Sequence, residues 1–231
     1  EARPKLFKKV AGHIAGMARL SEFKPQGLSN IVWAYATAKE SHPKMFKKVA
    51  EDIIRPDKLG QFDPQNISNI LWAYATAKES HPKLFKIVAG RIVALDKFGE
   101  FKPQELSNIV WAYATAEEPN SKLFKKVAEY IIGLDNLGQF NPQSISNIVW
   151  AYATAKESHP KMFKKVAEDI IRPDKLGQFD PQNISNILWA YATAKESHPK
   201  LFKIVAGRIV ALDKFGEFKP QELSNIVWAY A

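Results

Sequence analysis

Residues 28–38 read LSNIVWAYATA, and this stretch decides the fold because the chain repeats it almost letter for letter. Further copies begin at residues 67, 106, 145 and 184, and a shorter copy runs from 223 to 231. The tryptophans of successive copies are 39 residues apart, and no gap interrupts this period. A gapless period of this length is typical of stacked structural repeats. Residues 29–114 are also identical to residues 146–231, at an offset of 117 residues or three repeats.

Each repeat contains two segments with the spacing of a helix. Residues 25–38 carry apolar side chains at helical intervals and begin with a proline, which fits the first turn of a helix. Residues 43–54 carry one apolar stripe opposite charged residues, as an amphipathic helix does. The first segment is apolar or small nearly all round, so it must be covered on most sides. We therefore predict an all-α fold, an α-solenoid of tandem 39-residue helix-turn-helix repeats whose first helices line a concave face.

The repeat period also predicts the organisation of the chain. We expect a single α-solenoid segment over residues 1–231, with about six repeat units and no separate domain. The chain opens on the second helix of a repeat, expected at residues 4–16. The first helices are expected to start near residues 25, 64, 103, 142, 181 and 220. Because the last repeat stops within its first helix, we expect association or fraying at the ends of the array.

The composition excludes several classes of protein. The absence of cysteine excludes a disulfide scaffold and thiolate zinc sites. No histidine pair has metal-site spacing, and the apolar runs are too short to span a membrane. Candidate catalytic groups recur in every repeat, whereas a catalytic site is normally unique. We therefore expect no enzyme, metal, cofactor or membrane partner. The net charge of +9 suits a polyanion such as RNA, or marks a solvated lysine-rich face.

A narrow polar strip on the first helix is the candidate base-reading surface. Positions 27, 30, 34 and 37 share one face of that helix. Position 27 varies between repeats, whereas position 30 is always asparagine. A modular RNA reader needs fixed packing residues and a few variable polar ones, although exposed positions also vary by drift. The candidate base readers are Gly27, Asn66, Glu105, Ser144, Asn183 and Glu222, together with Asn30, Asn69, Asn108, Asn147, Asn186 and Asn225.

The remaining polar and aromatic residues of this helix have two interpretations each. The repeated asparagine either contacts a base or phosphate, or joins adjacent repeats through a hydrogen-bond ladder. The repeated tryptophan either stacks on a base or, as the spacing favours, packs in the core. Lysines at the two ends of the first helix are the candidate phosphate ligands: Lys24, Lys39, Lys78, Lys102, Lys156, Lys195 and Lys219.

The repeat resembles a known family. The unit F-x-P-Q-x-[LI]-S-N-I-[VL]-W-A-Y-A-T-A, followed by P-K-[LM]-F, resembles the octotricopeptide repeats of organellar proteins. It is also similar to the helical arrays that precede RAP domains and occur in FAST-kinase-like proteins. The resemblance covers essentially the whole chain. It implies sequence-selective binding of single-stranded RNA in a chloroplast or mitochondrion, acting on transcript stability, processing or translation.

The leading hypothesis is therefore a helical-repeat array that binds single-stranded RNA along its concave face. One alternative is a protein-interaction scaffold of the same fold, whose groove takes a peptide or a helix. Another is a consensus-like array without a selected target. The exact identity of residues 29–114 with residues 146–231 suggests this alternative.

Overall fold

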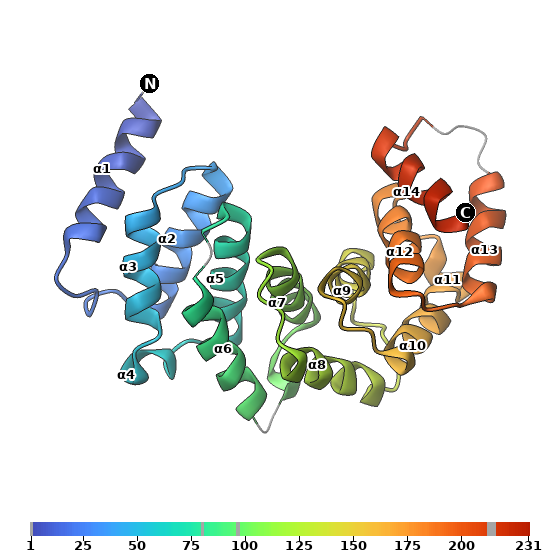
Figure 1. Ribbon diagram of the computed structural model, residues 1–231, viewed down its shortest axis with the longest axis horizontal. Coiled ribbons are helices and arrows are strands. Elements are labelled where there is room, and N and C mark those ends of the chain that lie inside the picture. The colour runs from blue at the N-terminus through green and yellow to red at the C-terminus, as the bar shows by residue number, and fades with distance from the viewer. Residues whose placement is uncertain (1, 80, 96–97, 212–215) are drawn as a thin grey trace. The chain divides into compact units, whose positions relative to one another are not determined.

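The computed structural model describes residues 2–79, 81–95, 98–211 and 216–231. All regular structure in these ranges is helical, and the helices follow one another in regular pairs (Figure 1). This confirms the prediction of an all-α helical-repeat solenoid. The first helices are α2 (Pro25–Ala38), α5 (Pro64–Ala77), α7 (Pro103–Thr115), α9 (Pro142–Ala155), α12 (Pro181–Ala194) and α14 (Pro220–Tyr230). The second helices are α1 (Ala2–Gly16), α3 (Pro43–Ile53), α6 (Pro82–Ala94), α8 (Ser121–Gly133), α10 (Pro160–Ile170) and α13 (Pro199–Val210).

Proline begins every first helix because its fixed φ suits the first turn, where no helical partner for an N–H exists. The second helices have a different N-cap. In α6 the Nδ1 atom of His81 accepts a hydrogen bond from the backbone N–H of Leu84, at 3.1 Å. In α8 the carboxamide oxygen of Asn120 takes that place and accepts from Leu123, also at 3.1 Å. Short helices α4 (Pro56–Leu59) and α11 (Pro173–Leu176) and the 3₁₀ turn η1 (Phe98–Glu100) lie in the connections between repeats.

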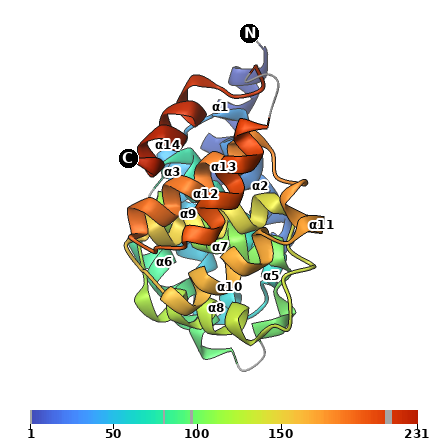
Figure 2. The same ribbon diagram turned by 90° about the vertical axis from the view of Figure 1, so that its right-hand side faces the viewer.

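The chain forms two compact units, residues 1–123 and 124–231, which are described separately. In the first unit α2 packs beside α5, and α5 beside α7. In the second unit α9 packs beside α12, and α12 beside α14 (Figure 2). The apolar residues that bind these layers together are fully buried, as Leu28, Val32 and Leu71 illustrate. Each unit therefore holds three first helices side by side, while the continuity of all six repeats as one array stays a prediction.

One tyrosine in each first helix joins it to the preceding second helix. The hydroxyl of Tyr74 in α5 donates a hydrogen bond of 2.6 Å to the carbonyl oxygen of Phe46 in α3. The two rings also meet edge to face, with centroids 5.1 Å apart. Both contacts recur in every repeat, with O···O distances from 2.6 to 2.8 Å. The pairs are Tyr35–Phe7, Tyr74–Phe46, Tyr113–Phe85, Tyr152–Phe124, Tyr191–Phe163 and Tyr230–Phe202.

These pairs contribute substantially to repeat stacking. Such a hydrogen bond contributes about 1 kcal/mol net, and an edge-to-face aromatic pair about another 1 kcal/mol beyond its buried area. The tyrosines of α5, α7, α9 and α12 are almost fully buried, so each hydroxyl needs its partner. The tyrosine and phenylalanine therefore define which second helix each first helix packs on.

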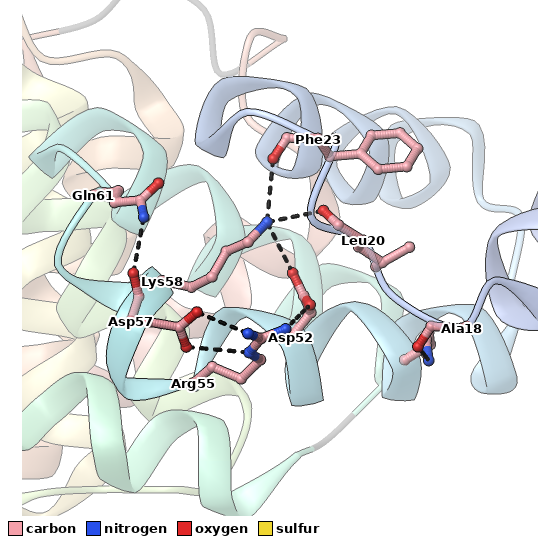
Figure 3. A network of polar contacts seen from close by, with 9 residues as sticks. Ala18, Leu20, Phe23, Asp52, Arg55, Asp57, Lys58 and Gln61 are labelled. Atoms are coloured by element: carbon pink, nitrogen blue, oxygen red, sulfur yellow. Dashed lines mark hydrogen bonds and ion pairs between the residues drawn. The ribbon is translucent and has the colours of Figure 1, made fainter.

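The buried side chain of Lys58 links α4 to the connection between α1 and α2 (Figure 3). The ammonium group of Lys58 in α4 donates to the carbonyl oxygens of Leu20, at 2.8 Å, and Phe23, at 3.3 Å. It also pairs with the carboxylate of Asp52 in α3, at 3.1 Å. Both charged side chains are buried, and burial of a charge is costly unless it is paired and hydrogen-bonded. The network therefore satisfies the backbone oxygens of the connection and the charges together.

Other repeats use different cations for the same purpose. In α6 the guanidinium of Arg91 donates to the carbonyl oxygen of Gly60, at 3.3 Å. In the second unit Lys175 donates to Leu137, at 3.3 Å, and Arg208 donates to the carbonyl oxygen of Gly177, at 3.4 Å. Part of the basic charge of the chain is thus structural, because these cations hold connections between repeats.

The buried tyrosines predict how stability depends on alkaline pH. Burial raises the pKa values of Tyr74, Tyr113, Tyr152 and Tyr191 well above the ordinary value of 10.0. Below pH 10 these residues are neutral in both states, so their contribution is fully present. Above pH 10 only the unfolded chain ionises, and each tyrosine should then lower the free energy of unfolding by about 1.4 kcal/mol per pH unit.

Urea unfolding between pH 8 and 11.5, with absorbance at 295 nm, measures this slope. Replacement of Tyr74 by Phe should make the slope shallower by the contribution of one tyrosine, about 1.4 kcal/mol per pH unit. The account of burial is contradicted if the folded tyrosines titrate near pH 10, or if the Tyr74→Phe variant keeps the slope of the wild-type chain.

Candidate nucleic-acid interface

The solvent-exposed face of each first helix carries the same four residues. In α2 they are Gln26, Asn30, Trp33 and Thr37, whose steps of four, three and four place them on one face. Their counterparts in the other complete helices are exposed or half-buried in the same way. This row of glutamine, asparagine, tryptophan and threonine is called the exposed stripe below. It combines amides, an indole and a hydroxyl, and it carries no formal charge.

The exposed stripe corrects the predicted strip at positions 27, 30, 34 and 37. Position 34 is buried in the four inner first helices, where Ala73, Ala112, Ala151 and Ala190 have no exposed surface, and half-buried at Ala34 and Ala229. The tryptophan predicted to lie in the core is instead 46% exposed at Trp33. A short alanine fits the tightly packed side of the helix, whereas the large indole extends over its surface. The exposed face of the helix thus includes positions 26 and 33 in place of the predicted positions 27 and 34.

The tryptophans lie next to one another across neighbouring first helices. The ring centroids of Trp33 in α2 and Trp72 in α5 are 6.5 Å apart, with planes 33° from parallel. In the second unit Trp150 and Trp189 are 6.4 Å apart, at 29°. Aromatic groups that are partly exposed and closely spaced can offer π faces to successive bases. The interpretation of these residues as a stacking surface therefore gains support over a purely internal role.

The asparagines of the stripe are available for contacts with a ligand. Asn30 is exposed, and Asn69, Asn108, Asn147, Asn186 and Asn225 are half-buried. Within the described ranges, the side chain of one of these asparagines forms a hydrogen bond: Asn225 accepts from Gln221, at 3.0 Å, within α14. The described residues therefore contain no hydrogen-bond ladder of asparagines between repeats. That alternative interpretation of the asparagines is wrong for this part of the chain.

The variable residues predicted to read bases take part in helix capping. Asp63 accepts the backbone N–H of Asn66, at 2.6 Å, so position 24 caps position 27. The same cap joins Asn141 to Ser144 and Asp180 to Asn183, at 2.7 Å. Where position 24 is lysine, which cannot accept, the bond is reversed. The carboxylate of Glu105 then accepts the backbone N–H of Lys102, and that of Glu222 accepts the N–H of Lys219, both at 2.8 Å.

The caps explain the acidic or amide residue at position 24 in α5, α9 and α12, and the glutamate at position 27 in α7 and α14, where position 24 is lysine. A cap satisfies N–H groups that the first turn of a helix leaves unpaired, and it contributes about 1 kcal/mol. The capping partners at position 27 are buried, with 3–7% of their surface exposed in Asn66, Glu105, Ser144, Asn183 and Glu222. In α2 the pair is Lys24 and Gly27, and no side chain caps the helix. Reading of bases by these residues stays a prediction.

The candidate phosphate ligands lie at both ends of the first helices. At the N-terminal end Lys24, Lys102 and Lys219 are exposed. At the C-terminal end four exposed lysines adopt left-handed backbone geometry, with φ of 56–57°: Lys39, Lys78, Lys156 and Lys195. The equivalent residue after α7 is Glu117, with φ of 58°. A side chain with a Cβ atom is disfavoured in this region, where glycine is the usual choice. Strain of this kind clusters at functional positions.

A cavity of about 410 Å³ brings these groups together between the C-terminal ends of α2 and α5. Its lining includes Thr37, Lys39, Trp72, Thr76 and Lys78. The hydroxyl of Thr76 is shielded from solvent and makes no hydrogen bond within the described part of the chain. An indole, hydroxyl groups, two ammonium groups and the carboxylate of Glu40 thus line one space. An indole beside ammonium groups suits a nucleotide.

The described ranges hold neither a candidate metal cluster nor a helix that could span a membrane. No group of three or more histidine, aspartate or glutamate side chains lies in an arrangement that could hold a metal ion there. None of the helices in those ranges has both the length and the apolar character needed to cross a bilayer.

Comparisons with known proteins place the chain in an RNA-related setting. Residues 17–178, well over half of the chain, match the family model described as RNA-editing substrate-binding complex 6 protein. Residues 175–188 match a short family model whose function is unknown. No curated protein matches the chain. The match supports a helical-repeat protein of an RNA-related family and does not extend to the octotricopeptide repeats in particular.

The capping pairs predict a compensated exchange of residues. Replacement of Glu105 by Asn next to Lys102 should lower the free energy of unfolding by about 1 kcal/mol, because neither residue can then cap α7. The double variant Lys102→Asp, Glu105→Asn reproduces the pair of α5 and should recover that loss. Urea unfolding measures both effects. A neutral single variant, or a double variant no more stable than the single one, would contradict the capping role.

Proposed function

Because the chain belongs to the family of RNA-editing substrate-binding complex 6 proteins, we propose that it binds single-stranded RNA along the exposed stripes of its first helices. The single observation that carries this proposal is the exposed stripe. Exposed or half-buried tryptophans and amides line the same face in each repeat, and a strained lysine follows that helix in four of the repeats. The proposal applies separately to the first helices of the two compact units, α2, α5 and α7 in one and α9, α12 and α14 in the other.

The bases would contact the centre of the stripe. Stacking of a base on an aromatic side chain contributes about 1–3 kcal/mol and tolerates every base, because every base has a π face. The amides of glutamine and asparagine both donate and accept, so they suit the polar edges of unpaired bases. Single-stranded RNA is favoured over a duplex because its bases are free to stack and to present those edges.

The phosphates would contact the lysines at the ends of the helices. Lys39 and Lys78 border the cavity next to Trp72, so an ammonium group and an indole are within reach of one nucleotide. A lysine acts on phosphate as a point charge, and the exposed position leaves its side chain free to follow the strand. The mild basic excess of the chain adds attraction at long range.

The remaining parts of the assignment follow the family. We propose a non-catalytic subunit of an RNA-editing assembly, with protein partners as well as RNA. We propose a mitochondrial location, since the family match supports a mitochondrion and gives no support to a chloroplast. The finer assignment to the octotricopeptide repeats rests on the likeness of the repeat motif alone.

The strained lysines supply a test that separates binding from folding. Replacement of Lys78 by Gly should raise the free energy of unfolding by about 1 kcal/mol, because glycine adopts the left-handed geometry without strain. The same variant should bind single-stranded RNA roughly fivefold more weakly and show a shallower salt dependence, by about 0.7 in the logarithmic slope.

The matched control is Glu117→Gly, at the equivalent position of the next repeat. It should gain similar stability without loss of RNA affinity, because it removes no positive charge. Fluorescence anisotropy at 50 and 200 mM salt measures binding. The proposal is wrong if the wild-type chain binds no RNA at low salt. The role of the lysine is wrong if Lys78→Gly binds like Glu117→Gly.

A further inference from the structure

We infer that the preferred RNA is a tract of one repeated nucleotide, and that the exposed stripes select it. This inference rests on the proposed function and goes beyond it, because it names the class of RNA. It also opposes the expectation that the variable residue at position 27 reads a different base in each repeat.

The first step is the invariance of the exposed stripe. Glutamine at position 26, asparagine at 30 and tryptophan at 33 occur in all six repeats, and threonine at 37 in the five repeats that extend that far. A helical-repeat code works by varying two or three base-contacting side chains from one repeat to the next. Here those contacts cannot vary, so every repeat offers a base the same donors, acceptors and π face.

The second step is the fate of the residues that do vary. Within the first helix, differences occur at positions 27, 28 and 32. Positions 28 and 32 exchange only leucine with isoleucine or valine with leucine. Position 32 is buried in the first five repeats, as at Val32 and Leu71, whereas Val227 in the last helix is 70% exposed. Position 27 is buried against the cap, as the hydrogen bonds of Asn66 and Glu105 show. The variable residues of the helix therefore leave the exposed surface almost unchanged.

The third step is the spacing of equivalent groups. Three first helices lie side by side in each unit, and the indoles of α2 and α5 are 6.5 Å apart. A strand that follows neighbouring helices would therefore meet the same stripe residues on one helix after another. A fivefold preference for one base at each site compounds over three sites to roughly a hundredfold, whereas a mixed strand loses it at every mismatch.

The test compares strands of equal length on the full chain. The probes are fluorescein-labelled A12, U12, C12 and G12, the last kept single-stranded in lithium buffer, and a 12-nucleotide strand of mixed sequence. One homopolymer should bind at least tenfold more tightly than the other homopolymers and the mixed strand. Replacement of Asn69 by Ala should reduce that preference at least threefold.

The matched control is Gln61→Ala, which removes an exposed amide outside the stripe. It should keep the preference of the wild-type chain. Equal binding of all strands, or tightest binding of the mixed strand, would overturn this inference and leave RNA binding intact. Retention of the full preference by Asn69→Ala would also overturn it. Absence of RNA binding at low salt would overturn the proposed function itself.

Discussion

The contact on which the structure depends is the hydrogen bond from a first-helix tyrosine to the carbonyl oxygen of a phenylalanine in the preceding second helix. It fixes which helices pack together, because a buried hydroxyl must find a partner and the ring beside it must meet its neighbour edge to face. The tyrosine points into the core, so the opposite side of the same helix faces solvent. Helical geometry then places glutamine, asparagine, tryptophan and threonine on that side in every repeat. The candidate interface is thus a consequence of how the repeats stack.

Part of the basic charge has a structural role. Lys58 and Arg91 reach back to carbonyl oxygens in the preceding connections, where the backbone has no helical partner. The contribution of Lys58 to attraction of a polyanion is reduced further by the buried carboxylate of Asp52, with which it pairs. In the part of the chain that the structure describes, the exposed lysines that follow the first helices, such as Lys39 and Lys78, do not hold a carbonyl oxygen of a connection. They keep a strained left-handed geometry that glycine would adopt more easily, which is why they are the stronger candidates for phosphate contacts.

The sequence predicts the fold class well because the 39-residue period, the apolar spacing and the prolines all lead to the same helical hairpin. It predicts the exposed face less well. Two sets of positions follow steps of three and four along the helix: 27, 30, 34 and 37, and 26, 30, 33 and 37. A helix with small residues all round gives no strong preference for which of these sets faces solvent. The helical spacing of the tryptophan favours the core, although an indole with one N–H also suits a partly exposed place such as that of Trp33. The linked variation of Lys102 with Glu105 and of Asp63 with Asn66 was visible as a capping pattern. The cation contacts were not predictable, because their acceptors are backbone oxygens.

Ultraviolet crosslinking of the chain to single-stranded RNA, followed by mass spectrometry of the crosslinked peptides, tests most directly whether the exposed stripes bind RNA. Crosslinks are expected within the first helices, at residues such as Trp72 and Trp111, because these indoles are the aromatic groups offered to the bases. Peptides that hold α5 and α7 should therefore carry the nucleotide adducts. Crosslinks confined to the second helices, with the first helices unmodified, would contradict the assignment of the interface to the stripes.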